Sequence, residues 1–213
     1  FFGLTVTPQE EAEMQPPHKV VKTAYPLFKH QNNAARKVIN NLYREPYRVL
    51  LHMPTGAGKT RTAMHVISDH LNSKESTVVV WLAHNEELCD QAASEFESAW
   101  RTLGNRDTNI YRFWGANEPD LSDISDGVVV AGLPKIYSRA KQSIAFISKL
   151  GNKSSLVIMD EAHQAIAPTY QLILDALVLP FPRTALLGLS ATPGRTWSDV
   201  TASNPHPKEF SWT

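Results

Sequence analysis

Residues 48–60 read RVLLHMPTGAGKT, and this stretch decides the fold of the chain. It joins a short apolar run over 49–53 to a helix-length segment that begins at Lys59, through a loop that contains two glycines. A strand, a glycine-rich turn and a helix in this order are typical of a phosphate-binding loop at the carboxyl end of a parallel strand. The stretch therefore predicts an α/β fold with a site for a nucleoside triphosphate.

Each part of this loop has a predicted chemical role. The two glycines let the backbone bend sharply and approach the phosphates, and the amides at the start of the following helix favour an anion. Lys59 is expected to bridge the β- and γ-phosphates, and the Thr60 hydroxyl to bind Mg²⁺. Met53 stands where the general pattern GxxxxGK[ST] has its first glycine. The predicted cradle consists of Pro54, Thr55, Gly56, Ala57 and Gly58.

A second motif, Asp160-Glu161-Ala162-His163, lies a hundred residues further on and follows the apolar run 156–159. Asp160 is expected to hold the water shell of the Mg²⁺ ion, opposite Thr60. Glu161 is placed to orient and deprotonate an attacking water, so the pair predicts hydrolysis. His163 is a candidate link to the hydroxyl-bearing segment Ser190-Ala191-Thr192.

Apolar runs alternate with amphipathic segments of helix length along the chain, which indicates a parallel sheet covered by helices on both faces. We expect one doubly wound domain over residues 22–197, a Pro-rich lead-in over 1–21 and a tail over 198–213. The predicted strands are Val49–Met53, Thr77–Ala83, Asn109–Trp114, Val128–Ala131, Leu156–Met159 and Ala185–Leu189. The predicted helices are His30–Tyr43, Lys59–Leu71, Glu86–Leu103, Pro134–Lys149 and Pro168–Leu177.

The composition excludes several classes of protein. The 213 residues are 42% hydrophobic, which is enough for a full core, and 21 basic residues balance 21 acidic ones. This neutrality argues against purely electrostatic coating of DNA but allows a local basic track. Cys89 is the only cysteine, which excludes a disulfide framework. No apolar stretch reaches membrane-spanning length and the first twenty residues lack a signal-peptide pattern, so we expect a cytoplasmic, nucleoid-associated protein.

Taken together, the motifs resemble the first motor domain of the superfamily 2 helicases and translocases. In that family Met or Ala precedes Pro-Thr-Gly in the phosphate loop, as Met53 does here. Residues 160–163 resemble motif II of the DEAH/DExH branch, and residues 190–192 resemble motif III. The segment Leu27-Phe28-Lys29-His30-Gln31 resembles an element of restriction-subunit and repair helicases that lies before the first helix.

The resemblance implies further site residues. The element before the first helix puts a glutamine on the adenine edge, which makes Gln31 the candidate and Phe28 or Tyr25 a possible stacking partner. Residues 82–88 resemble motif Ia, and residues 129–135 resemble the backbone-binding segment that follows it. The candidates for contact with nucleic-acid phosphates are then His84, Asn85, Gly132 and Lys135.

The resemblance covers only the first half of the family's motor, whose second RecA-like domain supplies an arginine finger. We therefore expect the chain alone to bind ATP and Mg²⁺ but to hydrolyse ATP poorly and not to unwind duplex. DNA is favoured over RNA as the nucleic acid, and nuclease, defence or repair subunits are possible partners. The alternatives are a P-loop kinase that transfers phosphate to a metabolite and an ATP-dependent assembly or timer module.

Overall fold

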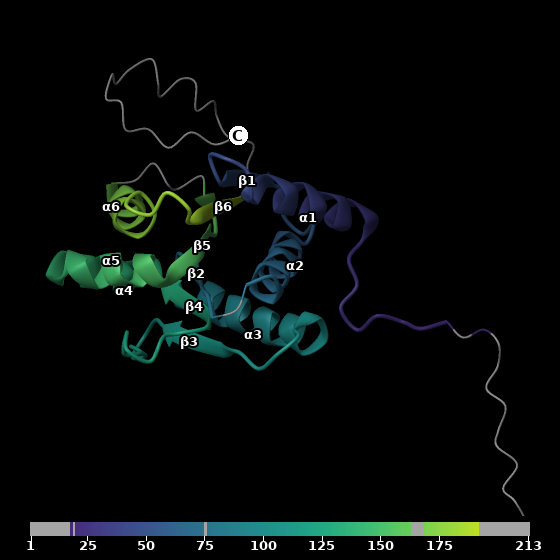
Figure 1. The fold of residues 1–213 in the computed structure, drawn as a ribbon, viewed down its shortest axis with the longest axis horizontal. Coiled ribbons are helices and arrows are strands. Elements are labelled where there is room, and N and C mark those ends of the chain that lie inside the picture. The colour runs from purple at the N-terminus through teal and green to yellow at the C-terminus, as the bar shows by residue number, and fades with distance from the viewer. Residues whose placement is uncertain (1–17, 19, 75, 163–167, 192–213) are drawn as a thin grey trace, which may run out of the picture.

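The computed structural model describes residues 18, 20–74, 76–162 and 168–191, which form an α/β domain around one parallel sheet (Figure 1). The strands pair in the order β1-β6-β5-β2-β4-β3, and every pairing between them is parallel. The sheet consists of β1 (Arg48–His52), β2 (Val78–Ala83), β3 (Asn109–Phe113), β4 (Gly127–Gly132), β5 (Ser154–Met159) and β6 (Ala185–Ser190).

Helices cover both faces of this sheet (Figure 1). One face packs against α1 (Lys29–Leu42), α2 (Lys59–Asn72) and α3 (Glu86–Leu103). The other face packs against α4 (Leu133–Gln142), α5 (Ile144–Lys153) and α6 (Pro168–Leu177). Strands buried on both faces are apolar throughout, as β2 and β4 are. The predicted doubly wound α/β class is therefore confirmed.

The predicted strands and four of the five predicted helices agree with the structure to within two residues at each end. The helix predicted over Pro134–Lys149 is wrong, because the chain forms two helices there. Ser143 between them has an extended backbone (φ −154°, ψ 97°), and its amide donates to the carbonyl of Arg139. The break leaves Ile144 at the surface and lets Ile147 and Leu150 face the core.

Close packing explains why the second of these helices runs on to Lys153. Gly151 lies inside α5, where a Cβ would come within 2.6 Å of the Phe181 ring and 2.7 Å of the Leu177 carbonyl oxygen. The segment therefore approaches α6 through a glycine that sequence periodicity treats only as a helix breaker. Tertiary contact outweighs local propensity here.

The carboxyl ends of the strands bring the predicted motifs to one edge of the sheet. The Met53 amide, where the phosphate loop begins, donates to the Ser190 carbonyl at 3.1 Å. The Asp160 amide donates to the Leu82 carbonyl at 2.9 Å, which joins the acidic motif to the end of β2. Ligands of open α/β sheets bind outside this edge. Among the described helices, none is long and apolar enough to span a bilayer.

The opposite edge of the sheet holds a buried polar cluster around His70. This side chain is 1% exposed, and its Nε2 lies 2.7 Å from the Ser155 hydroxyl while its Nδ1 lies 3.2 Å from the Tyr43 hydroxyl. Burial, together with the nearby charge of Lys74, lowers the pKa of His70 to about 3. The imidazole is therefore neutral in the folded protein at neutral pH.

This burial predicts that acid destabilises the fold. His70 takes up a proton near pH 6.5 when unfolded but only near pH 3 when folded, so the unfolded state binds more protons between these values. The free energy of unfolding should fall by about 1.4 kcal/mol per pH unit below 6.5, or about 2 kcal/mol at pH 5. Urea unfolding at pH 7, 6 and 5 measures this slope. His70→Gln should flatten it, whereas His52→Gln, at an exposed histidine, should leave it unchanged.

Candidate functional site

The phosphate loop has a backbone that depends on its glycines. Gly56 and Gly58 have φ values of +79° and +82°, which side chains disfavour. Gly58 precedes α2, and a Cβ there would lie 2.1 Å from Nε2 of Gln31. The Ala57 amide donates to the Pro54 carbonyl at 3.0 Å and closes the turn. The loop thus has the sharply bent backbone expected from the sequence, at the N-terminus of a helix that favours anions, and phosphate binding there stays a prediction.

Gln31 holds this loop in place. Its side chain is 4% exposed, its Nε2 donates to the Ala57 carbonyl at 2.9 Å and its Oε1 accepts from the Phe28 amide at 2.9 Å. The amide therefore ties the start of α1 to the phosphate loop. A role for Gln31 on the adenine edge stays a prediction, and it would use the amide's remaining hydrogen-bonding capacity.

The aromatic side chains beside Gln31 differ in accessibility. Phe28 is 71% exposed, and its ring stacks on that of His30, with 5.9 Å between centroids. Tyr25 is 3% exposed and lies under the Arg61 guanidinium, 3.9 Å from its ring centroid. Phe28 is thus the exposed aromatic that a base could reach.

The structure joins the two motifs directly. Nζ of Lys59 lies 3.1 Å from Oε1 of Glu161, across 102 residues of sequence. The side chains are 12% and 30% exposed, so the pair is partly screened from water. Glu161 has a φ of +55°, an uncommon conformation for a residue other than glycine. Unusual backbone at this point aims the carboxylate at the loop.

Asp160 is the best-buried carboxylate of the site, at 7% exposure. Burial raises its pKa, the charge of Glu161 adds to the rise and the charge of Lys59 opposes it. A carboxylate in such surroundings favours a cation beside it. Thr60 lies in the first turn of α2, so a hydroxyl and a carboxylate are available for Mg²⁺.

These two oxygen donors fit a site completed by phosphate and water oxygens. Within the described residues, no group of three or more His, Cys, Asp or Glu side chains forms an all-protein metal cage. Mg²⁺ usually binds one or two carboxylates plus substrate phosphates. The residues present therefore suit Mg²⁺ that arrives with a nucleotide.

The third predicted motif is described only in part. Ser190 ends β6 and is 2% exposed, next to the start of the phosphate loop, and Ala191 follows it. His163 and Thr192, most of the predicted lead-in and the whole predicted tail lie outside the described residues. The predicted link between His163 and this segment stays a prediction.

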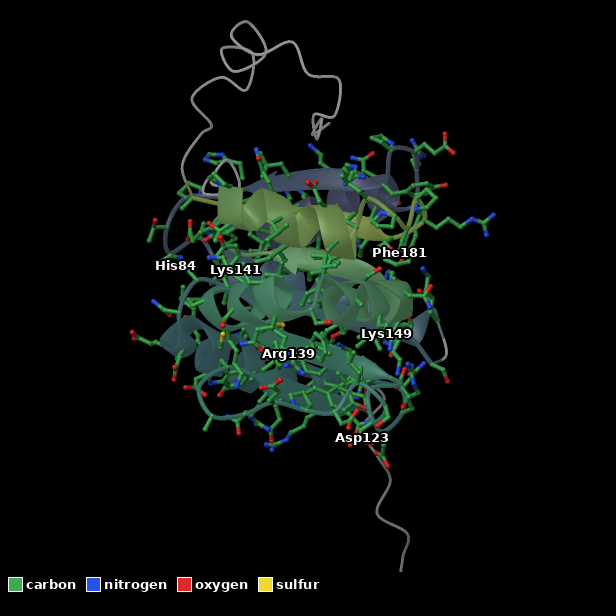
Figure 2. All side chains as sticks on the ribbon, turned by 90° about the vertical axis from the view of Figure 1, so that its left-hand side faces the viewer. His84, Asp123, Arg139, Lys141, Lys149 and Phe181 are labelled. Atoms are coloured by element: carbon green, nitrogen blue, oxygen red, sulfur yellow. The ribbon has the colours of Figure 1, made fainter. Side chains whose placement is uncertain are left out.

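Two candidates for nucleic-acid contact follow the end of β2. His84 is exposed at the rim of the molecule (Figure 2), and its Nδ1 lies 3.2 Å from the Tyr170 hydroxyl. Asn85 is also exposed, and its side chain accepts from the Leu88 amide at 2.9 Å. Asn85 therefore caps α3, so its side-chain oxygen already has a structural role.

The other two candidates lie where β4 leads into α4. Gly132 is buried, and a Cβ there would come within 3.2 Å of the Trp114 Cβ, so the glycine serves close packing. Nζ of Lys135 donates to the Gly115 carbonyl at 2.8 Å and lies 3.9 Å from Glu118. The Lys135 ammonium thus holds the loop after β3, and contact with phosphates stays a prediction for both residues.

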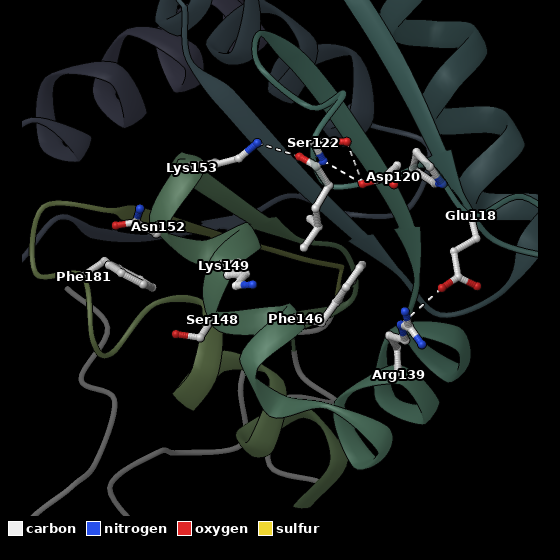
Figure 3. Close-up of a pocket in the computed structure, with 12 residues that line it drawn as sticks. Glu118, Asp120, Ser122, Arg139, Phe146, Ser148, Lys149, Asn152, Lys153 and Phe181 are labelled. Carbon is white, nitrogen blue, oxygen red and sulfur yellow. Dashed lines mark hydrogen bonds and ion pairs between the residues drawn. The ribbon is translucent and has the colours of Figure 1, made fainter.

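An open cavity of about 1050 Å³ lies away from these motifs, between the loop before β4 and helix α5 (Figure 3). Lys153 donates to the carbonyls of Leu121 and Ile124, and Arg139 pairs with Glu118 at 3.2 Å. Lys153 and Arg139, which line the cavity, therefore hold the loop before β4 against helices α4 and α5. None of the predicted site residues lines this cavity.

Two residues beside the site were not among the predicted site residues. Nε2 of His30 lies 3.3 Å from the Ala57 carbonyl, and the Tyr170 hydroxyl, from the first turn of α6, lies 3.2 Å from Nδ1 of His84. His30 could have been predicted to lie near the phosphate loop, because it is next to Gln31 in the sequence. Nothing in the sequence marks Tyr170, because its partners come from other elements.

Comparison with known proteins agrees with this geometry. Residues 24–195 match the family model described as the type III restriction enzyme res subunit. A putative ATP-dependent helicase of Saccharomyces cerevisiae, IRC3, is 26% identical over 184 residues, covering 82% of this chain and 25% of the yeast protein. A putative ATP-dependent RNA helicase of African swine fever virus, QP509L, is 29% identical over 173 residues, covering 81% of this chain and 30% of the viral protein.

Solved structures support the fold. A DEAD box protein from Methanococcus jannaschii superposes with a TM-score of 0.58 at 22% identity, covering 83% of this chain and 51% of that one. The chain spans less than a third of the length of the two curated relatives. It belongs to the family of the type III restriction enzyme res subunit and has the N-terminal RecA-like domain of the superfamily 2 helicases.

Proposed function

We propose that the chain is the ATP-binding first motor domain of a DNA helicase or translocase. ATP and Mg²⁺ bind at the phosphate loop, and a second RecA-like domain of the complete protein closes over them. Hydrolysis then reopens the two domains and moves the protein along the nucleic acid.

The observation that carries this proposal is the contact between Lys59 and Glu161. A triphosphate offers the Lys59 ammonium several anionic oxygens, so this side chain would leave Glu161 and bind the β- and γ-phosphates. With Lys59 on the phosphates, the Glu161 carboxylate would accept a proton from a water molecule beside the γ-phosphate. Thr60 and Asp160 would hold Mg²⁺, which would neutralise part of the phosphate charge.

The adjacent carboxylates favour water over a metabolite as the acceptor, which supports a hydrolase over a kinase. The choice of DNA rests on the family description, which names a restriction enzyme, whereas the viral relative is described as an RNA helicase. Phosphate contacts near His84 would fix position on the strand without reading sequence.

The test is ATP hydrolysis by the complete protein with no nucleic acid, with single-stranded DNA, with duplex DNA and with RNA of matched length. We expect DNA to raise the rate at least about tenfold, with a smaller effect of RNA. Stimulation by RNA alone would overturn the choice of DNA. A hydrolysis rate that neither DNA nor RNA changes would favour an assembly or timer module and would contradict the proposed motor function.

A further inference from the structure

We propose that the hydrogen bond between Tyr170 and His84 couples nucleic-acid contact at the end of β2 to the acidic motif of the ATP site. Tyr170 would act as a positioning residue, and His84 as the group that meets a phosphate of the nucleic-acid backbone. This inference rests on the proposed function and adds the route by which nucleic acid regulates the ATP site.

The sheet places the two ends of this route side by side. Strand β2 pairs with β5 in a register that sets Leu82 beside Met159. The Asp160 amide donates to the Leu82 carbonyl, two residues before His84. His84 and Asp160 therefore follow the carboxyl ends of neighbouring strands. A displacement of the backbone near His84 would change the position of the backbone at Asp160.

Tyr170 spans the remaining gap from a third element. It lies on α6, which follows the acidic motif along the chain, and its ring is 5% exposed among the apolar side chains of the second core. The Tyr170 hydroxyl is 3.2 Å from Nδ1 of His84. Burial raises the pKa of this hydroxyl, and the negative charges of Asp160 and Glu161 raise it further.

Hydrogen-bond chemistry gives the pair two arrangements. A neutral imidazole carries one N–H, so if Nε2 donates to a phosphate oxygen, Nδ1 must accept, and the Tyr170 hydroxyl donates to it. If Nδ1 carries the proton instead, it donates to the Tyr170 oxygen, and the hydroxyl proton then points away from His84. A phosphate at the exposed Nε2 thus selects the first arrangement and redirects the Tyr170 dipole.

The rigid surroundings let this small change matter. The Tyr170 ring is held by packing, and Asp160 is held through its amide, so the hydroxyl reorients without moving away from the site. The electrostatic surroundings of the metal-binding and water-orienting carboxylates then differ between the two arrangements. A coupling of this kind is reciprocal, so bound ATP must change nucleic-acid affinity by the same factor.

The test measures the affinity of the complete protein for a non-hydrolysable ATP analogue, with and without saturating single-stranded DNA. We expect DNA to change the wild-type affinity about fivefold or more. Tyr170→Phe keeps the ring and removes the hydroxyl, and His84→Ala removes the partner. Each should reduce the factor to less than about twofold, and the double variant should match the single ones because the two residues act as a unit.

The matched control is Tyr111→Phe, which removes a hydroxyl that donates to the Asp123 carbonyl at 3.0 Å, far along the sheet. In this variant, DNA should change the affinity for the ATP analogue by the same factor as in the wild-type protein. Wild-type coupling in Tyr170→Phe, or additive losses in the double variant, would overturn this inference alone. If the wild-type protein shows no coupling, the motor function fails as well. Since His84 lies at the surface, His84→Ala reports on coupling even if Tyr170→Phe unfolds.

Discussion

Replacing Lys59 with alanine should lower ATP hydrolysis by the complete protein about 10²–10³-fold, the cost of removing one group that stabilises charge in a transition state. The affinity for ATP should fall about 10–100-fold, because a hydrogen bond to a charged group contributes about 1.5–3 kcal/mol. The side chain is only 12% exposed, so water cannot replace the lost ammonium well. Fluorescence titration with a labelled ATP analogue and a steady-state hydrolysis assay measure the two effects.

The control for this experiment is Lys37→Ala, at an exposed lysine of α1 that lies outside the predicted site. Both variants lose one positive charge, so a general effect of net charge would appear in both. If Lys59→Ala bound the analogue as tightly as the unaltered protein, the phosphate loop would not be the nucleotide site.

Replacing Glu161 with glutamine should separate binding from hydrolysis. Glutamine keeps the shape of the side chain but cannot accept a proton, so hydrolysis should fall about 10²–10⁴-fold, the usual contribution of a general base. ATP binding should stay equal or become tighter, because Lys59 no longer pairs with a carboxylate that competes with the phosphates. Single-turnover hydrolysis and equilibrium titration distinguish the two steps.

Glu97→Gln provides the matched control. Glu97 pairs with Arg101 four residues along α3, at the surface, so the change breaks one ion pair in each case. Surface pairs contribute about 0–1 kcal/mol, and this variant should keep both binding and hydrolysis. A loss of ATP affinity in Glu161→Gln would show that the carboxylate supports the loop instead of competing with the phosphates.

Much of the fold could be predicted because its signals are local. The strand into the phosphate loop, the capped helix α3 and the apolar strands β2 and β4 follow from residue types at fixed spacing. The predicted helix over 134–149 was wrong for the opposite reason. Ser143 breaks the helix with an extended backbone, and the packing of Gly151 against Leu177, which lets α5 continue to Lys153, joins residues far apart in sequence.

The candidate site shows the same division. Its chemical groups, Lys59, Thr60, Asp160 and Glu161, could be named from their motifs, since phosphate and metal binding need those residue types in that order. The second bond of Gln31, to the Ala57 carbonyl, could not be predicted, because it depends on how α1 packs against the loop. The position of Tyr170 beside His84 is likewise a matter of packing.

The sequence by itself determined the fold class, the nucleotide chemistry and the family resemblance, because each depends on neighbours along the chain. Only the tertiary structure decided the strand order, which sets β5 between β6 and β2. This order brings Oε1 of Glu161 to 3.1 Å from Nζ of Lys59. Contacts across a hundred residues depend on which strands pair and in what register, and many orders satisfy the same local pattern. Burial of the strands between the two layers of helices then selects one of these strand orders.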